Sequence, residues 1–139
     1  LIAGGDDGIK SALKDQIKNL GLTASVFLIG RVNHEQKKEL LSNCTAFALA
    51  SEFESFGIVV AEALSCGCPV VVSNKTPWKD IEENNCGIFA QNEKKSFYHA
   101  FCKINKENYQ KENCREYVRA HFDWEVISKD FVNSFLTER

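Results

Sequence analysis

The sequence predicts an α/β fold built on a parallel sheet with helices on both faces. Short apolar runs rich in β-branched residues alternate with segments whose apolar residues recur at helical spacing, a pattern typical of βαβ units. The run Pro69–Val72 shows no polar alternation, as expected of a central strand that is covered on both faces. Beyond Glu93 only helical patterns follow, and they predict C-terminal helices that close the fold.

The elements follow one another in a clear order. An amphipathic helix begins near Ile9 and ends at Gly21, and a second helix begins at Asn33, which forms a capping box with Gln36. A further helix starts where Thr76 is the N-cap and Pro77 the first helical residue, and it runs to about Glu83. The predicted strands are Leu1–Ala3, Val26–Ile29, Ala46–Ala50, Pro69–Val72 and, as an edge strand, Gly87–Phe89, with one more helix over Gly57–Ser65.

Composition limits the function. The length of 139 residues fits one domain, and Leu1 already lies inside a strand pattern, so we expect a single domain over residues 1–139 that is truncated at its N-terminal edge. Basic and acidic residues number 17 and 19 and are well mixed, which argues against a nucleic-acid partner. No apolar run is long enough to span a bilayer and no signal segment opens the chain, which favours a cytoplasmic location.

The six cysteines lack the spacing of a metal site. They lie in apolar runs, so we expect buried free thiols and no metal ion. The acidic pair Asp6-Asp7 lies in a glycine-rich turn, Gly4–Gly8, that matches no complete phosphate-binding motif, and we expect it to stabilise that turn.

Ligands of an open parallel sheet bind beyond the carboxyl ends of its strands, which makes the loop Ser51–Gly57 informative. Residues 57–73 contain a single charged side chain, Glu62, and burying an unpaired charge costs several kcal/mol. Glu62 therefore reaches water, pairs with a protein donor, or awaits a ligand hydroxyl. Glu54 lies eight residues earlier, and the helical rise predicts a separation of at most ~12 Å along one helix flank.

Between the two carboxylates lie the main-chain amides of residues 55–58, at the start of the predicted helix. Free amides at a helix N-terminus attract phosphate. A nucleotide-sugar, which has hydroxyls at both ends and a diphosphate in the middle, suits this arrangement.

The segment Ser51–Leu64, followed by Cys66–Val71, resembles the E-x7-E signature of glycosyltransferase family 4. The resemblance extends to Leu1–Gly5, the Gly30–Val32 turn, Gly87–Phe89 and Phe122–Trp124, and so covers nearly the whole chain. It implies the C-terminal, Rossmann-like half of a GT-B enzyme.

The resemblance also implies roles for individual residues. Glu54 is the expected catalytic residue and faces hydroxyls of the donor hexose, whereas Glu62 holds the ribose hydroxyls. The other expected donor-binding residues are Ser55, Phe56, Gly57 and Ile58 through their amides, Arg31 and Val32 near the base, and Gly5. Ser55 stands where the family often has glycine, which crowds the approach of the phosphates.

The implied activity is transfer of a hexose from a nucleotide diphosphate-sugar with retention of configuration, without metal or cofactor. The acceptor, a glycan or a lipid, is expected on a missing N-terminal domain, in polysaccharide or lipopolysaccharide biosynthesis and with peripheral membrane association of the full-length protein. The family's basic Arg and Lys on the first strand and loop have no counterpart before Leu1. We therefore expect this chain alone to be inactive.

Two other classes remain open. A flavodoxin-like or receiver-type binding module shares the βα alternation, but Ala50-Ser51 stands where a phosphoacceptor Asp is needed. A sugar-nucleotide epimerase of GT-B fold binds the same ligands, although the E-x7-E spacing argues against it.

Overall fold

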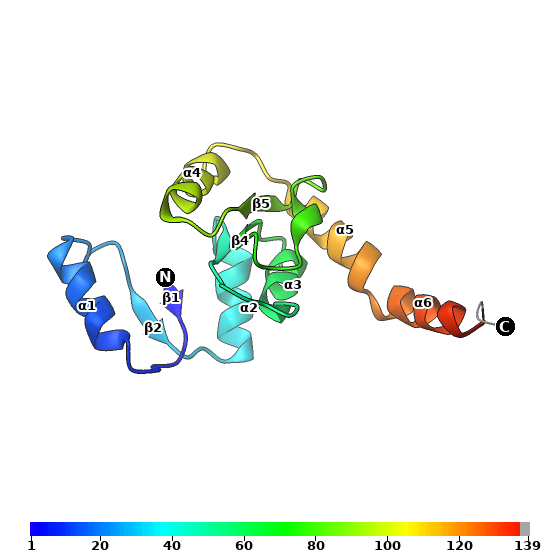
Figure 1. Cartoon of the computed structure of the whole chain (residues 1–139), viewed down its shortest axis with the longest axis horizontal. Coiled ribbons are helices and arrows are strands. Elements are labelled where there is room, and N and C mark those ends of the chain that lie inside the picture. The colour runs from blue at the N-terminus through cyan, green and yellow to red at the C-terminus, as the bar shows by residue number, and fades with distance from the viewer. Residues whose placement is uncertain (137–139) are drawn as a thin grey trace. The chain divides into compact units, whose positions relative to one another are not determined.

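The computed structural model describes residues 1–136 and confirms an α/β fold with parallel sheets flanked by helices (Figure 1). The chain forms two compact units, the first comprising Leu1–Lys37 and the second beginning at Lys38, and each is described by itself. The single domain expected over residues 1–139 stays a prediction, and its last three residues lie outside the described part of the chain.

The first unit contains a two-stranded parallel sheet and one helix. Strand β1 (Ile2–Ala3) pairs with β2 (Leu28–Gly30), and α1 (Lys10–Asn19) lies between them in the chain. Gly21 lies two residues beyond the end of α1 and stops the helix as predicted: it has φ +67°, and its N–H donates to the carbonyl of Lys18 at 3.0 Å. The Asp6 carboxylate accepts a hydrogen bond from the Gly8 N–H at 3.0 Å, which confirms its role in the turn.

Helix α2 (His34–Asn43) starts with the predicted capping box. The Gln36 N–H donates to Asn33 Oδ1 at 2.8 Å, and the Asn33 N–H donates to Gln36 Oε1 at 3.0 Å. The helix runs across the boundary at which the second unit begins. Because Asn33 and Gln36 bind each other's N–H groups, the first turn of α2 is fixed by residues that are neighbours in sequence.

The second unit contains a three-stranded parallel sheet in the order β3 (Phe47–Leu49), β4 (Val70–Ser73), β5 (Gly87–Ala90). All four residues of β4 are buried, and β5 lies at the edge, so the predicted central and edge strands are confirmed. The described strands form two sheets instead of one. Apolar runs identify strands but carry no information on which strands pair, so the sequence alone did not separate the two.

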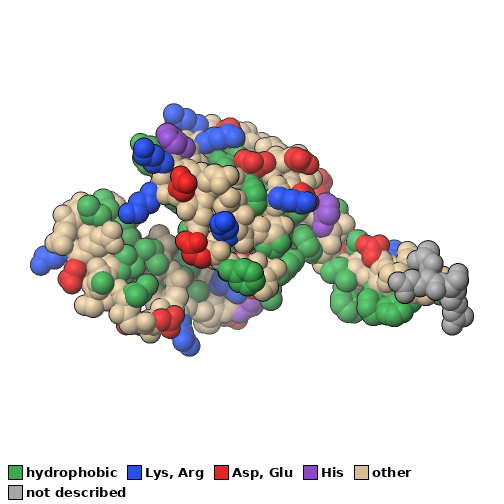
Figure 2. All heavy atoms as spheres, in the orientation of Figure 1, with side chains coloured by type: hydrophobic (Ala, Val, Ile, Leu, Met, Phe, Trp, Pro, Cys, Tyr) green, Lys and Arg blue, Asp and Glu red, His purple; other side chains and the backbone are tan. Residues whose placement is uncertain are grey.

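Helices cover both faces of this three-stranded sheet (Figure 1). Val70 and Val72 face a core formed with α3 (Ile58–Ser65) and α5 (Lys111–Phe122), whereas Val71 faces α4 (Lys94–Ile104). The last helix, α6 (Trp124–Leu136), follows α5 after a single residue; none of its residues is buried, and Figure 2 shows hydrophobic side chains on its surface. The C-terminal helices are thus confirmed, while α6 leaves its apolar side exposed.

The predicted helix from Thr76 to about Glu83 is wrong. One short 3-10 turn, Lys79–Ile81, takes its place, and Trp78 instead of Thr76 precedes it. The Thr76 hydroxyl donates to the carbonyl of Ser73 at 2.8 Å, so the side chain closes a turn after β4 and does not cap a helix.

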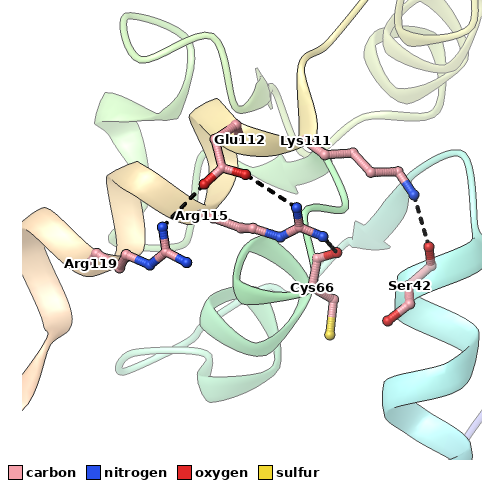
Figure 3. A network of polar contacts seen from close by, with 6 residues as sticks. All are labelled: Ser42, Cys66, Lys111, Glu112, Arg115 and Arg119. Carbon is pink, nitrogen blue, oxygen red and sulfur yellow. Dashed lines mark hydrogen bonds and ion pairs between the residues drawn. The ribbon is translucent and has the colours of Figure 1, made fainter.

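Basic side chains of α5 bind the C-terminal carbonyls of two other helices (Figure 3). Lys111 Nζ donates to the Ser42 carbonyl at 3.0 Å, and Arg115 donates to the Cys66 carbonyl at 3.4 Å. Glu112 forms ion pairs with Arg115 at 3.2 Å and with Arg119 at 3.1 Å. Positive charge at the carbonyl ends of α2 and α3 favours this packing.

All six cysteines are free thiols, as predicted, but only Cys68, Cys86 and Cys114 are buried. The sulfur atoms of Cys44 and Cys68 lie 3.0 Å apart. The hydrogen bond between the two sulfur atoms lowers the pKa of Cys44 to about 7, because it stabilises the Cys44 thiolate. The same hydrogen bond and burial raise the pKa of Cys68.

We expect half-buried Cys44 to react with iodoacetamide with a pH midpoint near 7, since the thiolate is the reactive species and is already populated there. Replacing Cys68 by alanine should move the midpoint up toward the ordinary thiol value of about 8.5. Alkylation of the Cys44 peptide, followed by mass spectrometry across pH 5–10, measures this shift. Cys86→Ala, which removes another buried thiol, should leave the midpoint in place; an unchanged midpoint in Cys68→Ala would contradict the assignment.

Candidate functional site

The loop Ser51–Gly57 leaves the carboxyl end of β3 and is tied to the loops that follow β4 and β5. The Ser73 hydroxyl donates to the Ser51 carbonyl at 2.6 Å, and Asn92 Nδ2 donates to the same carbonyl at 3.4 Å. Asn74 Nδ2 donates to Gln91 Oε1 at 2.7 Å and links the two later loops. Side chains from the end of β4 and from the loop after β5 thereby fix where the Ser51–Gly57 loop begins.

Gly57 is the N-cap of α3, and its backbone requires glycine. It is buried and has φ +77°, in the left-handed region that L side chains rarely adopt. A Cβ atom there would lie 3.0 Å from Cγ of Glu54 and 3.3 Å from Nε1 of Trp78. The half-buried Glu54 side chain therefore lies directly against the glycine at the helix start.

An aromatic cluster around Trp78 packs against the same loop. Trp78 is 2% exposed, and its ring centroid lies 5.1 Å from those of Phe56 and Phe122. The Trp78 indole N–H donates a hydrogen bond to the Phe56 carbonyl. Trp78 is thus a core residue that also holds the main chain of the loop.

Main-chain amides at the start of α3 are available to a ligand. Within residues 1–136, the N–H groups of residues 55–58 donate to no protein acceptor. Ser55 and Ile58 are exposed, so water or a ligand reaches this end of the helix. Such amides, together with the helix dipole, suit an anion.

The two carboxylates lie on different elements. Glu62 is half-buried within α3 and has an interaction partner inside the chain. Glu54 precedes the helix by four residues, because α3 begins only at Ile58. The expectation that both carboxylates share one helix flank is therefore wrong: the left-handed Gly57 ends the loop and the helix starts after it.

Three predicted donor-binding residues belong to the first unit. The Cβ position of Gly5 lies 3.0 Å from Arg31 Nε, so these two residues are neighbours, and Val32 follows Arg31 after β2. A pocket in this unit is lined by Gly4, Gly5, Asp6, Lys10 and apolar neighbours from β1, β2 and α1. The other six predicted residues lie in the second unit, along residues 54–62.

Sequence reasoning missed the contacts that hold this segment. Trp78 and Ser73 contact residues of the Ser51–Gly57 loop that lie 22 positions away in the chain, and Asn92 contacts one that lies 41 positions away. The only available signal was their location in loops at the carboxyl ends of strands.

The part of the chain that the structure describes, residues 1–136, contains no group of three or more His, Cys, Asp or Glu side chains arranged to hold a metal ion. None of its helices combines the length and apolar character that a membrane span requires.

The family model described as "Glycosyl transferases group 1" matches residues 1–121. Alpha-1,3/1,6-mannosyltransferase ALG2 of Dictyostelium discoideum is 36% identical over 112 residues, which is 75% of this chain and 27% of that protein. Uncharacterized glycosyltransferase MJ1607 of Methanocaldococcus jannaschii is 26% identical over 141 residues, covering 97% of this chain and 36% of the relative. The chain therefore spans only about a third of the length of these curated relatives.

Solved structures share the fold. The lipopolysaccharide outer core galactosyltransferase WaaB superposes with a TM-score of 0.83 at 20% identity, covering 99% of this chain and 40% of WaaB. Anabaena Alr3699/HepE, solved in complex with UDP-glucose, gives a TM-score of 0.72 at 23% identity, covering 97% of this chain and 40% of HepE. These neighbours are glycosyltransferases of GT-B fold, which confirms the predicted fold class.

Proposed function

Because the chain belongs to the glycosyl transferases group 1 family, we propose that residues 54–62 form the donor site of a hexosyltransferase that uses a nucleotide diphosphate-sugar. In this proposal Glu54 faces the hexose, the amides of Ser55 to Ile58 bind the diphosphate, and Glu62 binds the ribose. The donor-binding roles that the resemblance implies for Arg31, Val32 and Gly5, which belong to the first unit, stay expectations.

One observation carries the proposal. Four consecutive main-chain N–H groups have no protein acceptor within residues 1–136, and carboxylates flank them in sequence on both sides. Amides held in place by a hydrogen bond from the buried Trp78 bind an anion without reorganising, which favours departure of a diphosphate. A carboxylate on either side accepts hydrogen bonds from sugar hydroxyls.

The finer assignment follows from the resemblance to family 4. We propose a retaining, metal-independent reaction in which helix amides and basic side chains neutralise the leaving diphosphate. The chain is proposed as the C-terminal half of a GT-B enzyme whose acceptor, a glycan or a lipid, binds to another domain of a cytoplasmic protein. One relative is named a mannosyltransferase and one structural neighbour a galactosyltransferase, so the proposal does not specify which hexose is transferred.

Calorimetry of the full-length protein tests the proposal. We expect one nucleotide diphosphate-sugar among the uridine, guanosine and adenosine series to bind, with a Kd of about 1 μM–1 mM, the range in which KM values of enzymes ordinarily lie. Failure of all three series to bind would overturn the proposal. Product analysis with the ligand that binds separates transfer from epimerisation, because an epimerase would release an altered nucleotide-sugar without an acceptor.

A further inference from the structure

We propose that Trp78 is a positioning residue of the donor site, which aims the Gly57 N–H at the donor diphosphate by holding the Phe56 carbonyl. The inference rests on the proposed function, because it concerns the same amides. Trp78 lies outside residues 54–62 and is not one of the expected donor-site residues. The basis of the inference is the direct hydrogen bond from the Trp78 indole N–H to the Phe56 carbonyl oxygen.

The direction of the amide follows from peptide geometry. The described chain has no cis peptide bond, so the Phe56 C=O and the Gly57 N–H lie in one plane and point in opposite directions. The carbonyl points toward an indole that is 2% exposed. The Gly57 N–H therefore points away from the core, on the side where the exposed residues Ser55 and Ile58 lie.

Glycine alone does not fix this orientation. Gly57 has φ +77°, and glycine adopts positive and negative φ with similar ease, so the Phe56–Gly57 peptide is free to rotate as a unit if nothing holds it. Rotation would turn the Phe56 carbonyl oxygen toward the position proposed for the phosphates, where it would repel them. The indole hydrogen bond removes this alternative, because the rotated state would leave a buried N–H donor without an acceptor.

Packing and hydrogen bonding by Trp78 can be separated experimentally. Its ring contacts Phe56, Phe122 and Tyr117, with centroid distances of 5.1, 5.1 and 6.4 Å. Trp78→Phe keeps an aromatic ring in that cluster but has no N–H to donate. Incorporation of β-(3-benzothienyl)alanine at position 78 keeps the shape of the indole more closely and replaces the N–H by sulfur.

The test compares two probes on the full-length protein, the nucleoside diphosphate of the donor that binds and the corresponding nucleoside. Without the Trp78 hydrogen bond, the Gly57 N–H is no longer directed at the phosphates. The affinity for the nucleoside diphosphate should then fall by about tenfold or more, since hydrogen bonds to charged groups are the strong ones. Nucleoside affinity should stay within about twofold, because the nucleoside carries no phosphate. The ratio of the two Kd values is the readout, and general loosening of the fold would lower both affinities together.

Trp124→Phe is the matched control, since Trp124 is 78% exposed and lies on α6. It should leave the Kd ratio unchanged. If Trp78→Phe fails to fold, the benzothienyl variant supplies the same comparison with the core filled. An unchanged ratio in the folded variant overturns the positioning role alone, whereas a wild-type protein that binds neither probe overturns the proposed function itself.

Discussion

Replacing Gly87 by alanine is expected to disrupt the three-stranded sheet. A Cβ atom at this position would lie 2.1 Å from the carbonyl oxygen of Val70 and 2.9 Å from its carbonyl carbon. Backbone atoms cannot move aside as a side-chain end does, so β5 would have to separate from β4, where Gly87 pairs with Val70. Overpacking of this kind costs about 3 kcal/mol or more. Chemical denaturation measures the loss in free energy of unfolding.

Gly21→Ala is the comparison for this prediction. Gly21 has φ +67°, and a Cβ atom there would have no neighbour within 4 Å, so the substitution adds backbone strain without overlap. The expected cost is about 1–2 kcal/mol. Equal losses for the two alanine variants would show that the close approach of β4 and β5 is not what requires glycine at position 87.

Local patterns predicted most of the described fold. The capping box of Asn33 and Gln36 and the helix end at Gly21 depend on residues within five positions of one another, and both are observed. The helix predicted to start at Thr76 is not observed, because the Thr76 hydroxyl can either cap a helix or close the turn at Ser73. The sequence does not show which of these two hydrogen bonds forms.

The candidate site was predictable in its chemistry and only partly in its geometry. The single carboxylate in an apolar helix and the glycine before it were visible as a pattern, but the left-handed Gly57, which keeps Glu54 off the helix, was not. The contact of Trp78 with Phe56 and that of Cys44 with Cys68 join residues 22 and 24 positions apart. Such contacts depend on how strands pair and helices pack, which no local pattern encodes.

Substitution of the two site carboxylates should separate turnover from donor binding. Glu54→Gln is expected to lower kcat by about 100-fold with little change in donor KM, because a charge close to the reacting hexose acts mainly in the transition state. Glu62→Gln is expected to raise the donor KM by about tenfold with little change in kcat, because hydroxyls of the ribose are held equally in both states. Steady-state kinetics of the full-length protein with varied donor measure both parameters.

Glu52→Gln provides the control, since Glu52 is exposed in the same loop, two residues from Glu54, and carries the same charge. If lowering the negative charge of the loop were enough to slow the reaction, Glu52→Gln would reproduce part of the Glu54→Gln effect. The proposed contact of Glu54 with the hexose requires instead that Glu52→Gln behave as wild type. The opposite result would be that Glu54→Gln raises KM and Glu62→Gln lowers kcat. The hexose would then lie at Glu62, and the donor would bind along the helix in the reverse direction.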